Sequence, residues 1–462
     1  MKTKLNIVYL HSHDTGRYIS PYGYKINTPN LENFAKEGIV FRNCFTASPT
    51  CSPSRAALLT GEYAHSCGMY GLAHRGFTAD CSKHIIHTLR EYGYKSFLLG
   101  IQHIISHQRQ NEIGYDEIID LSSINDSKSI TDMVPLAEEF FTRSHKAPFF
   151  ISIGCSETHR VFPEHDAEND PRWIRPPEIL PDTPETRLDM ARFNTSAQRY
   201  DKGVGEIMDI LKKSGLAENT LVIITTDHGV AFPEMKCTLT DHGLGVLMMM
   251  RGPKGFSGGK VINGMISQVD IFPTICEYLD IPAPERLQGV SFLPLLENNK
   301  KEVREEIFAE INSHSAYEPM RCVRTTRYKY IRRLLEKHLT PVLSNFGEGT
   351  SKTLWLDYGW SEHRYQQEEL YDLIFDPMER NNIAKKPEMA KVIKGMRKRL
   401  ERWMRETNDP ALQYGRPPMP DTAMLNDLEA PSPILSTATS MNNEKRQHNE
   451  IPIIRGNFKS LN

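Results

Sequence analysis

Short apolar runs alternate along the first half of the chain with stretches whose apolar residues have helical spacing. The runs rich in β-branched or apolar side chains are residues 7–10, 96–99, 149–153 and 221–225. Strands that alternate with helices build parallel βαβ units. We therefore expect an α/β sandwich with a central, mostly parallel sheet flanked by helices. Functional loops should lie at the carboxyl ends of its strands.

Three stretches between these runs have helical patterns, namely residues 30–37, 53–59 and 194–213. The second of them has Pro53 near its start, as the first turn of a helix allows. The amino end of that helix lies beside Cys51. Because the first backbone N–H groups of a helix have no partner within it, they would face any anion held next to Cys51.

The pattern changes near residue 300, where a charged, polar run (297–304) is followed by an antiparallel strand pattern over 322–331 and a helical one over 387–407. We expect a catalytic α/β domain at 1–300 and a smaller α+β domain at 301–408. Prolines, Ser, Thr, Asn and scattered charges dominate residues 409–462, which predicts a polar tail that lies over the surface or lacks order.

Composition and charge narrow the class of protein. The 462 residues are 39% hydrophobic and 25% charged, as in globular proteins, and 56 basic and 58 acidic side chains give a formal charge of -2. Such a balance argues against nucleic-acid or membrane-surface binding. The first ten residues lack a signal-peptide core, and no run of about 18 apolar residues, the length of a membrane span, occurs. The eight cysteines show no spacing typical of zinc sites or of a disulfide framework. These features predict a cytoplasmic protein.

The strongest chemical signal is the segment 51–61, CSPSRAALLTG. Read alone, Cys51 would be a buried structural cysteine, because a free thiol is mostly protonated and no base is evident beside it. The whole segment, however, resembles the signature of type I sulfatases, in which Cys-x-Pro-x-Arg directs oxidation of the cysteine to formylglycine. The resemblance extends to TPNL at 28–31, FRNCF at 41–45 and ELYDL at 369–373. Residues 68–72, GMYGL, look most similar to the heparan N-sulfatase (sulfamidase) branch.

This resemblance implies an alkaline-phosphatase-like fold and a nucleophile made from Cys51. A hydrated formyl group has two hydroxyls, one to attack sulfur and a second that later loses its proton and expels the sulfate. A divalent metal lowers the pKa of the hydroxyl and neutralises the sulfuryl oxygens. The ligand set that carries over is His13, Asp14, Cys51, Asp227 and His228.

The two metal-binding pairs, His13-Asp14 and Asp227-His228, depart from the commonest family forms, Asp-Asp and Asp-Asn. Calcium follows from the resemblance and stays one of the alternatives if His13 only forms hydrogen bonds. Imidazole is a poor calcium ligand and a good one for manganese, iron or zinc, so two nitrogen ligands would favour a transition ion.

The resemblance also assigns catalytic residues. Arg55, one helical turn after Cys51, would reach the diol and the metal-bound carboxylates. His103 would act as the base in sulfate elimination, and His159 as the general acid on the leaving group. Lys236 would contact the sulfate. The family has a lysine where this chain has Ile101, so that contact is missing or comes from elsewhere, with Gln102 and Arg109 as candidates.

Other tempting residues have simpler interpretations. His65 and His74 flank the signature helix and are expected at the edge of the site. Asp241-His242 repeats the Asp227-His228 dipeptide, but loop packing or substrate contact is a better interpretation than a second metal site. Cys67 and Cys81 would pair only in an oxidising setting, which spacing alone does not establish.

The sequence therefore predicts a sulfuric ester or sulfamate hydrolase acting on a sulfated small molecule or glycan, matured by a formylglycine-generating or anaerobic sulfatase-maturing enzyme. One alternative is a phosphonate monoester or phosphodiester hydrolase of the same superfamily, favoured by Asp227-His228 and Ile101. A second is a sulfatase-like binding protein without turnover. No nucleic-acid or membrane partner is expected, and assembly into a homo-oligomer stays open.

Overall fold

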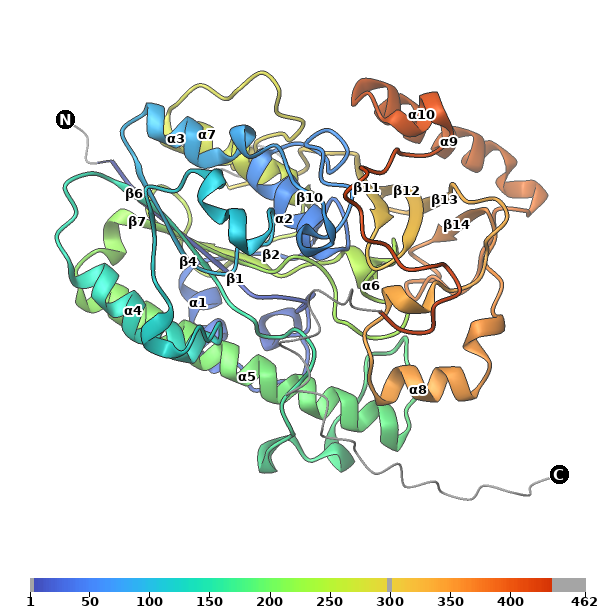
Figure 1. The fold of residues 1–462 in the computed structure, drawn as a ribbon, viewed down its shortest axis with the longest axis horizontal. Coiled ribbons are helices and arrows are strands. Elements are labelled where there is room, and N and C mark those ends of the chain that lie inside the picture. The colour runs from blue at the N-terminus through green and yellow to red at the C-terminus, as the bar shows by residue number, and fades with distance from the viewer. Residues whose placement is uncertain (1–3, 297–300, 434–462) are drawn as a thin grey trace.

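The computed structural model describes residues 4–296 and 301–433, and its elements form a larger and a smaller sheet side by side (Figure 1). The larger sheet, with helices on both of its faces, is built from the first 262 residues. The smaller sheet is antiparallel and belongs to the second part of the chain. The expected boundary near residue 300 adjoins a segment, 297–300, that lies outside the described residues.

The central sheet has eight strands in the order β5-β4-β6-β1-β7-β8-β2-β9. Its neighbours run parallel except where β8 pairs with β7 and β2, which confirms the predicted, mostly parallel sheet. The strands are β1 (Asn6–His11), β2 (Ile39–Phe41), β4 (Lys95–Gly100), β5 (Glu117–Ile118), β6 (Phe149–Gly154), β7 (Thr220–Thr225), β8 (Met248–Arg251) and β9 (Lys260–Ile262). A two-stranded sheet joins β3 (Cys44–Phe45) to β10 (Ile266–Ser267).

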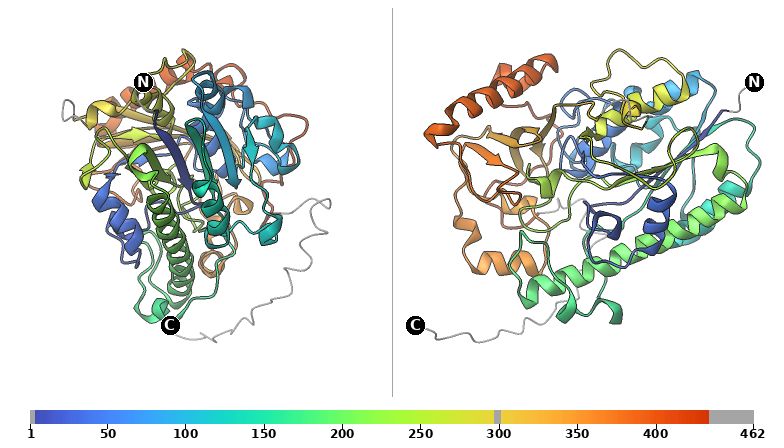
Figure 2. Two further views of the ribbon diagram at one scale, coloured as in Figure 1. Left: turned by 90° about the vertical axis from the view of Figure 1, so that its left-hand side faces the viewer. Right: turned by 180° about the vertical axis from the view of Figure 1, so that it is seen from behind.

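Alternating side chains of the central strands pack into two cores, one on each face. On β1, Ile7 and Tyr9 belong to the first core, and Val8 and Leu10 belong to the second. The first face is covered by α2 (Cys51–Thr60), α3 (Ile85–Glu91) and α7 (Ile271–Leu279), and the second by α1 (Pro29–Glu37), α4 (Ile130–Thr142) and α5 (Pro184–Lys213), as Figures 1 and 2 show. Burial on both faces explains why these strands appear in the sequence as continuous apolar runs.

All three predicted helices of the first domain begin earlier than the sequence pattern indicated, α1 by a single residue. Helix α2 begins at Cys51 itself, because the extended backbone of Thr50 ends just before it. Helix α5 begins at Pro184, ten residues before the predicted start, where Thr183 and Thr186 exchange side-chain and backbone hydrogen bonds in a capping box. A threonine at the third position of that box replaces the usual Glu or Gln, so the start signal was weak.

The smaller sheet has the order β11-β12-β13-β14 and packs against the part of the chain that contains the larger sheet. Its strands are β11 (Glu306–Ser313), β12 (Tyr317–Thr325), β13 (Tyr328–Arg333) and β14 (Glu368–Asp372), accompanied by α8 (Thr350–Asp357) and α9 (Ala390–Glu406). Phe308 and Trp403 share a core with Tyr63 and Val269. The two parts therefore bury apolar surface against each other, and the exact domain limits remain a prediction.

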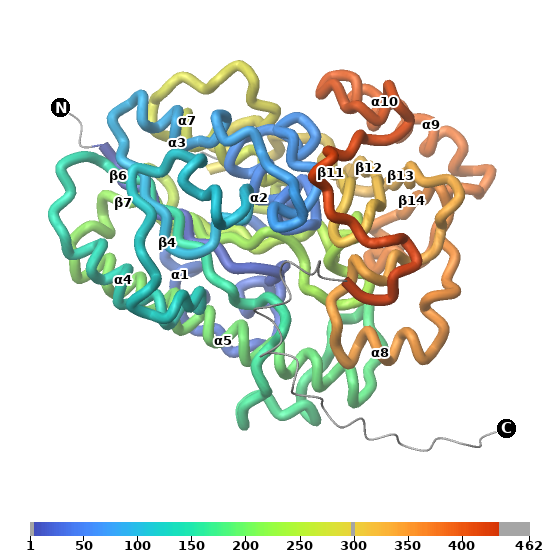
Figure 3. The backbone as a smooth tube through the Cα atoms, viewed as in Figure 1, coloured from blue at the N-terminus to red at the C-terminus, as the bar shows by residue number. Residues whose placement is uncertain are grey.

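The segment after Asp409 begins with the short helix α10 (Pro410–Tyr414), which the sequence pattern did not indicate. The chain then crosses the surface (Figure 3). Along this path the Tyr317 hydroxyl donates to the Pro417 carbonyl over 2.7 Å, and Thr422 Oγ1 donates to the Gly76 carbonyl over 2.7 Å. The part of the predicted tail at 434–462 lies outside the described residues.

Across residues 4–296 and 301–433, no helix combines the length and the apolar composition that a membrane crossing requires. All eight cysteines carry free thiols, and these include Cys67 and Cys81.

Candidate active site

Two acidic residues meet at the carboxyl edge of the central sheet. Strands β1 and β7 are parallel neighbours in register from Asn6 to His11, so the loops that follow them leave the sheet side by side. Asp14 lies in the first loop and Asp227 in the second, and the backbone N–H of Asp14 donates to Asp227 Oδ1 over 2.8 Å. This contact fixes the two carboxylates relative to each other.

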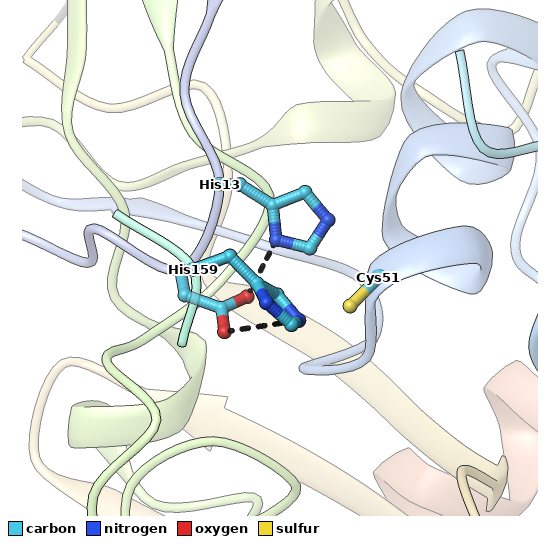
Figure 4. A group of neighbouring side chains, drawn as sticks. His13, Cys51 and His159 are labelled. Carbon is cyan, nitrogen blue, oxygen red and sulfur yellow. Dashed lines mark hydrogen bonds and ion pairs between the residues drawn. The ribbon is translucent and has the colours of Figure 1, made fainter. Parts of the chain in front are cut away.

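Helix α2 brings Cys51 to the same place as its first residue. Figure 4 shows its sulfur projecting from the start of the helix toward the rings of His13 and His159. The side chain is buried, at 2% exposure, and Cys51 Sγ lies 3.4 Å from Nε2 of His228. A group at this position meets both the loops of the sheet edge and the amino end of a ten-residue helix.

The side chains form two overlapping groups of metal-ligand atoms. The groups are His13, Asp14, Cys51 and His159, and Asp14, Cys51, Asp227 and His228, each with its atoms within 4.8 Å of one another. His13 Nδ1 lies 2.9 Å from Asp14 Oδ1, and His228 Nε2 lies 3.3 Å from the same oxygen. Two buried carboxylates with imidazole nitrogens are a donor set that suits a divalent cation.

Two buried cations balance the two carboxylates. Lys236 Nζ donates to Asp14 Oδ2 over 2.7 Å, and Arg55 Nη2 donates to Asp227 Oδ2 over 2.9 Å. Arg55 also donates to the carbonyl of Ser12 over 3.0 Å. Because each of these side chains is almost fully buried, the attraction between them acts through little water.

The local charges stabilise an anion at position 51. Burial raises the pKa of the Cys51 thiol, but the charges of Lys236, His13 and His228 outweigh it and hold that pKa well below the usual value. Burial acts to lower the pKa of His13, yet the nearby Asp227, Cys51 and Asp14 raise it to about 9. The site is therefore arranged around negative charge on residue 51.

His103 and His159 complete the ring of side chains around the cysteine. His103 Nδ1 lies 3.4 Å from His13 Nε2, and the ring makes a hydrogen bond to Cys51. His159 Nε2 lies 4.0 Å from Asp14 Oδ2, and its side chain is 44% exposed. His159 is thus the most exposed member of this group.

Two of these loops hold strained backbones. Asp14 has φ 60° and His103 has φ 61°, in the left-handed region that residues other than glycine rarely adopt. Strain of this kind persists where the surrounding contacts fix the conformation, and it concentrates at functional sites. In this chain it orients one carboxylate and one imidazole toward Cys51.

Neither candidate for the missing lysine is placed to replace it. Gln102 Oε1 accepts hydrogen bonds from the amides of Ile104 and Ile105, and its Nε2 donates to the Ile105 carbonyl, so the amide is used within its own loop. Arg109 forms an ion pair with Glu112 over 2.6 Å, and both side chains are half exposed. The cations that the described residues place at the carboxylates are Arg55 and Lys236.

Of the two histidines expected at the edge of the site, His74 lies there and His65 does not. His65 is buried and pairs with Glu310 over 2.8 Å, away from the ligand groups. The Asp241 carboxylate pairs with Arg324 and Lys329, which confirms loop packing as its role. The ring of His74 stacks on His103 with centroids 6.0 Å apart and is exposed, so it lies on the rim.

One residue that couples electrostatically to the site escaped the sequence analysis. His314 lies between β11 and β12, yet its ring interacts electrostatically with Lys236, Cys51, His228 and Asp14. Nothing in the sequence around it signals this position, because it depends on how the smaller sheet packs against the larger one.

Comparison with known proteins decides the family. A model of the Sulfatase family matches residues 5–281, more than half of the chain. The chain belongs to the sulfatase family. A second model, for the C-terminal part of N-sulphoglucosamine sulphohydrolase, matches residues 235–340. These matches confirm the family and the enzyme class that the segment 51–61 predicted.

Individual relatives cover most of the chain. N-sulphoglucosamine sulphohydrolase of Homo sapiens is 29% identical over 441 residues, which cover 83% of this chain and 86% of that protein. An ulvan-active sulfatase of Formosa agariphila is 29% identical over 421 residues, covering 88% and 81%. The crystal structure of a putative sulfatase from Bacteroides fragilis superposes with a TM-score of 0.72 at 19% identity, covering 90% and 99%, which supports the shared fold.

Proposed function

We propose that this sulfatase removes sulfate from an O-sulfate ester or an N-sulfamate of a sugar, with formylglycine made from Cys51 and one divalent metal ion. The observation that carries the proposal is the position of Cys51 Sγ, at the start of α2 and within 4.8 Å of ligand atoms from Asp14, Asp227 and His228. Hydrated formylglycine beside a divalent metal would supply the hydroxyl nucleophile and the second hydroxyl that expels sulfate.

His13, Asp14, Asp227 and His228 would hold the metal, together with an oxygen of modified residue 51. The carboxylates fit any hard divalent cation, and the imidazoles of His13 and His228 add nitrogen donors. Calcium is the ion that the family suggests, whereas two nitrogen ligands favour manganese or another transition ion. Metal analysis of protein purified without added chelator distinguishes these cases.

Arg55 and Lys236 orient the carboxylates and stabilise charge. Because Arg55 holds Asp227 and the Ser12 carbonyl, it keeps one carboxylate in place from beneath the site. Lys236 is bound to Asp14 and carries an ammonium whose pKa is raised by that carboxylate despite burial. Fixed positive charges of this kind stabilise a transition state most where its negative charge develops.

Two imidazoles are suited to proton transfer. His103 hydrogen-bonds residue 51, so it is placed to take a proton from that residue when sulfate leaves. His159, half exposed, is placed to give a proton to the oxygen or nitrogen of the leaving group. Both rings contact the ring of His13, with centroids 5.3 Å away for His103 and 4.5 Å away for His159.

A sugar substrate is supported by the relatives. One is named for N-sulphoglucosamine and the other for ulvan, which supports a sulfated sugar as the substrate of this chain. The maturing enzyme, the cytoplasmic location and any homo-oligomer remain predictions from the sequence.

A phosphonate monoester or phosphodiester hydrolase remains the second candidate, because His228 and Ile101 reduce the likeness to the commonest sulfatase site. The test is a single comparison of kcat/KM for 4-nitrophenyl sulfate, glucosamine N-sulfate and bis-4-nitrophenyl phosphate. The protein is coexpressed with a maturing enzyme and loaded with one metal at a time, and mass spectrometry of the Cys51 peptide verifies the aldehyde. A preference for the phosphodiester, or full activity with an unmodified thiol, would overturn the proposal.

A further inference from the structure

The residue that follows His159 is held in place by three hydrogen bonds from its own side chain. Arg160 Nη1 donates to Asp189 Oδ1 over 2.9 Å and Nη2 donates to Asp189 Oδ2 over 2.7 Å, so the two groups pair at two points. The remaining donor, Nε, donates to the carbonyl of Ala231 over 2.7 Å. A planar guanidinium that uses its donors on fixed acceptors in this way has one orientation.

The partners of Arg160 come from two other segments around the site. Asp189 belongs to α5, and its side chain is 2% exposed. Ala231 belongs to the loop after β7, in which the amide of Lys236 donates to the carbonyl of Val230 over 3.0 Å. Arg160 therefore links the segment after β6 both to a long helix and to the loop that carries a cation of the site.

The guanidinium of Arg160 is enclosed by aromatic rings and by the chain before α8. Its Cζ atom lies 4.4 Å from the ring centroid of Phe162 and 5.2 Å from that of Phe232. A Cβ atom at Gly349 would lie 2.3 Å from Nη1, so the backbone passes directly against the charged group. The Arg160 side chain is 11% exposed. Because little water reaches the pair with Asp189, its hydrogen bonds are stronger than those of a surface ion pair.

The backbone carbonyl of Arg160 contacts the imidazole of His159. Nδ1 of His159 hydrogen-bonds the carbonyl oxygen of Arg160. A carbonyl oxygen can only accept, so Nδ1 carries the hydrogen of that bond. Nε2 is then the nitrogen that exchanges protons, and it lies 4.0 Å from Asp14 Oδ2. The position of this carbonyl therefore determines both the direction of the ring and the nitrogen that is free to act.

We propose that Arg160 is a positioning residue, whose side chain fixes the backbone after β6 and whose carbonyl orients His159 with Nε2 toward the leaving group. The inference rests on the proposed sulfatase function, in which His159 protonates that group. Proton transfer requires hydrogen-bond distance between donor and acceptor, so a displacement of the ring by about 1 Å is enough to lower the rate on the order of 10²-fold.

The step that depends on this position is the departure of the leaving group. An ionised hydroxyl of modified residue 51 bonds to sulfur, and the leaving oxygen or nitrogen takes the electron pair of its bond to sulfur. The proton on Nε2 of His159 passes to that atom. The ring becomes neutral and keeps the hydrogen on Nδ1, where the Arg160 carbonyl accepts it.

The test uses the full-length, aldehyde-containing enzyme and changes the ion pair from both sides. Arg160→Lys keeps a positive charge next to the buried carboxylate but removes the two-point contact. Asp189→Asn keeps the volume of the partner and is the second variant if Arg160→Lys does not fold. The matched control is Arg192→Lys, because Arg192 of α5 pairs with both oxygens of Glu164 in the segment that follows Arg160. Thermal unfolding and metal analysis verify that all variants are folded and equally loaded.

The first probes are phenyl sulfate and 4-nitrophenyl sulfate, which react at the same kind of bond but differ in the pKa of the departing phenol. We expect Arg160→Lys and Asp189→Asn to lower kcat about ten- to a hundred-fold for phenyl sulfate and less than about threefold for 4-nitrophenyl sulfate. KM should change less than about twofold, and Arg192→Lys should match the parent. A loss confined to the poorer leaving group identifies an effect on the proton donor, which general loosening of the fold would not give.

A double variant separates the positioning of His159 from every other role of Arg160. In a His159→Asn background the imidazole is absent, so adding Arg160→Lys should lower kcat less than about threefold further. The substrate is whichever of phenyl sulfate, glucosamine N-sulfate and glucosamine 6-O-sulfate the parent hydrolyses fastest.

The same fold loss with and without His159 would overturn the inference while the sulfatase proposal stands. Equal losses on the two aryl sulfates, or parent-like rates for both Arg160→Lys and Asp189→Asn, would do the same. Failure of the aldehyde-containing parent on every sulfate would instead overturn the proposed function, and the inference with it.

Discussion

The backbone amide of Asp14 is bound to the carboxylate of Asp227, over 2.8 Å between the nitrogen and Oδ1. The two residues come from loops after β1 and β7, which pair directly along their whole length. Each carboxylate has a separate cation on its remaining oxygen, Lys236 for Asp14 and Arg55 for Asp227. The acidic pair therefore behaves as one unit, and a change to either residue leaves a buried cation without its partner.

Asp14→Asn and Asp227→Asn should each abolish metal retention and turnover, because an amide cannot replace a carboxylate that balances both a metal and a buried cation. Elemental analysis after dialysis should give less than about a tenth of the parent's metal content. Asp209→Asn, an exposed position on α5, is the matched control. Normal metal content in both site variants would refute the ligand assignment.

His159→Asn should lower kcat more for a substrate whose leaving group has a higher pKa. A general acid contributes about 10²- to 10⁴-fold when the leaving group needs a proton, and far less when it departs as a stable anion. We expect a large loss of kcat on sugar sulfates and a small one on 4-nitrophenyl sulfate. A plot of log kcat against leaving-group pKa should be steeper for the variant, and parallel lines for both enzymes would contradict this role.

Glu318 should make the protein less stable as the pH rises toward 7. Burial raises the pKa of this β12 carboxyl from 4.5 to about 7, although Arg333 and Asn345 act in the opposite direction. The folded state therefore holds the proton more tightly than the unfolded state. The stabilisation is complete below about pH 4.5 and is lost as the pH rises through about 7, by on the order of 3 kcal/mol.

Glu318→Gln should remove that part of the pH dependence, as measured by urea unfolding between pH 5 and 8. A remaining slope is expected from Glu379, whose pKa burial also raises to about 7. The variant should gain stability relative to the parent at pH 8. An unchanged slope would show that Glu318 does not titrate in this range.

Arg75→Met should loosen both the tip of the hairpin between β11 and β12 and the crossing segment after α10. Arg75 is buried, and its Nη1 donates to Asn426 Oδ1 over 3.0 Å and to the carbonyls of Ser315 and Met424. Loss of these charge-assisted bonds should cost about 2 to 3 kcal/mol of unfolding free energy. Limited proteolysis should cut residues 415–433 faster than in Arg42→Met, an exposed control. Equal cleavage rates would contradict the anchoring role.

Local pattern predicted the central strands well because both of their faces are buried. Residues 149–153 and 221–225 are apolar at every position that meets a core, and the structure extends each strand by one residue. The antiparallel direction of β8 had no such signal, since an apolar run carries no information about strand direction.

The acidic and histidine residues directly after β1 and β7 were predictable for a related reason, since the carboxyl ends of parallel neighbours converge. The electrostatic coupling of His314 to the site was not, because the position of its hairpin depends on contacts of Ser313 and Asn345 that link segments far apart in the sequence. Tertiary contacts of this kind leave no local periodicity.

The pairing of β1 with β7 has a consequence for the newly made chain. Leu221 is the register partner of Ile7, so β1 leaves the ribosome about 200 residues before this neighbour, an interval of about 10 to 40 seconds at 5 to 20 residues per second. His228, which contacts the sulfur of Cys51, emerges after that strand. During synthesis, Cys51, which ends up 2% exposed, therefore passes through a period in which the modification that the proposed function requires would not be blocked by the folded site.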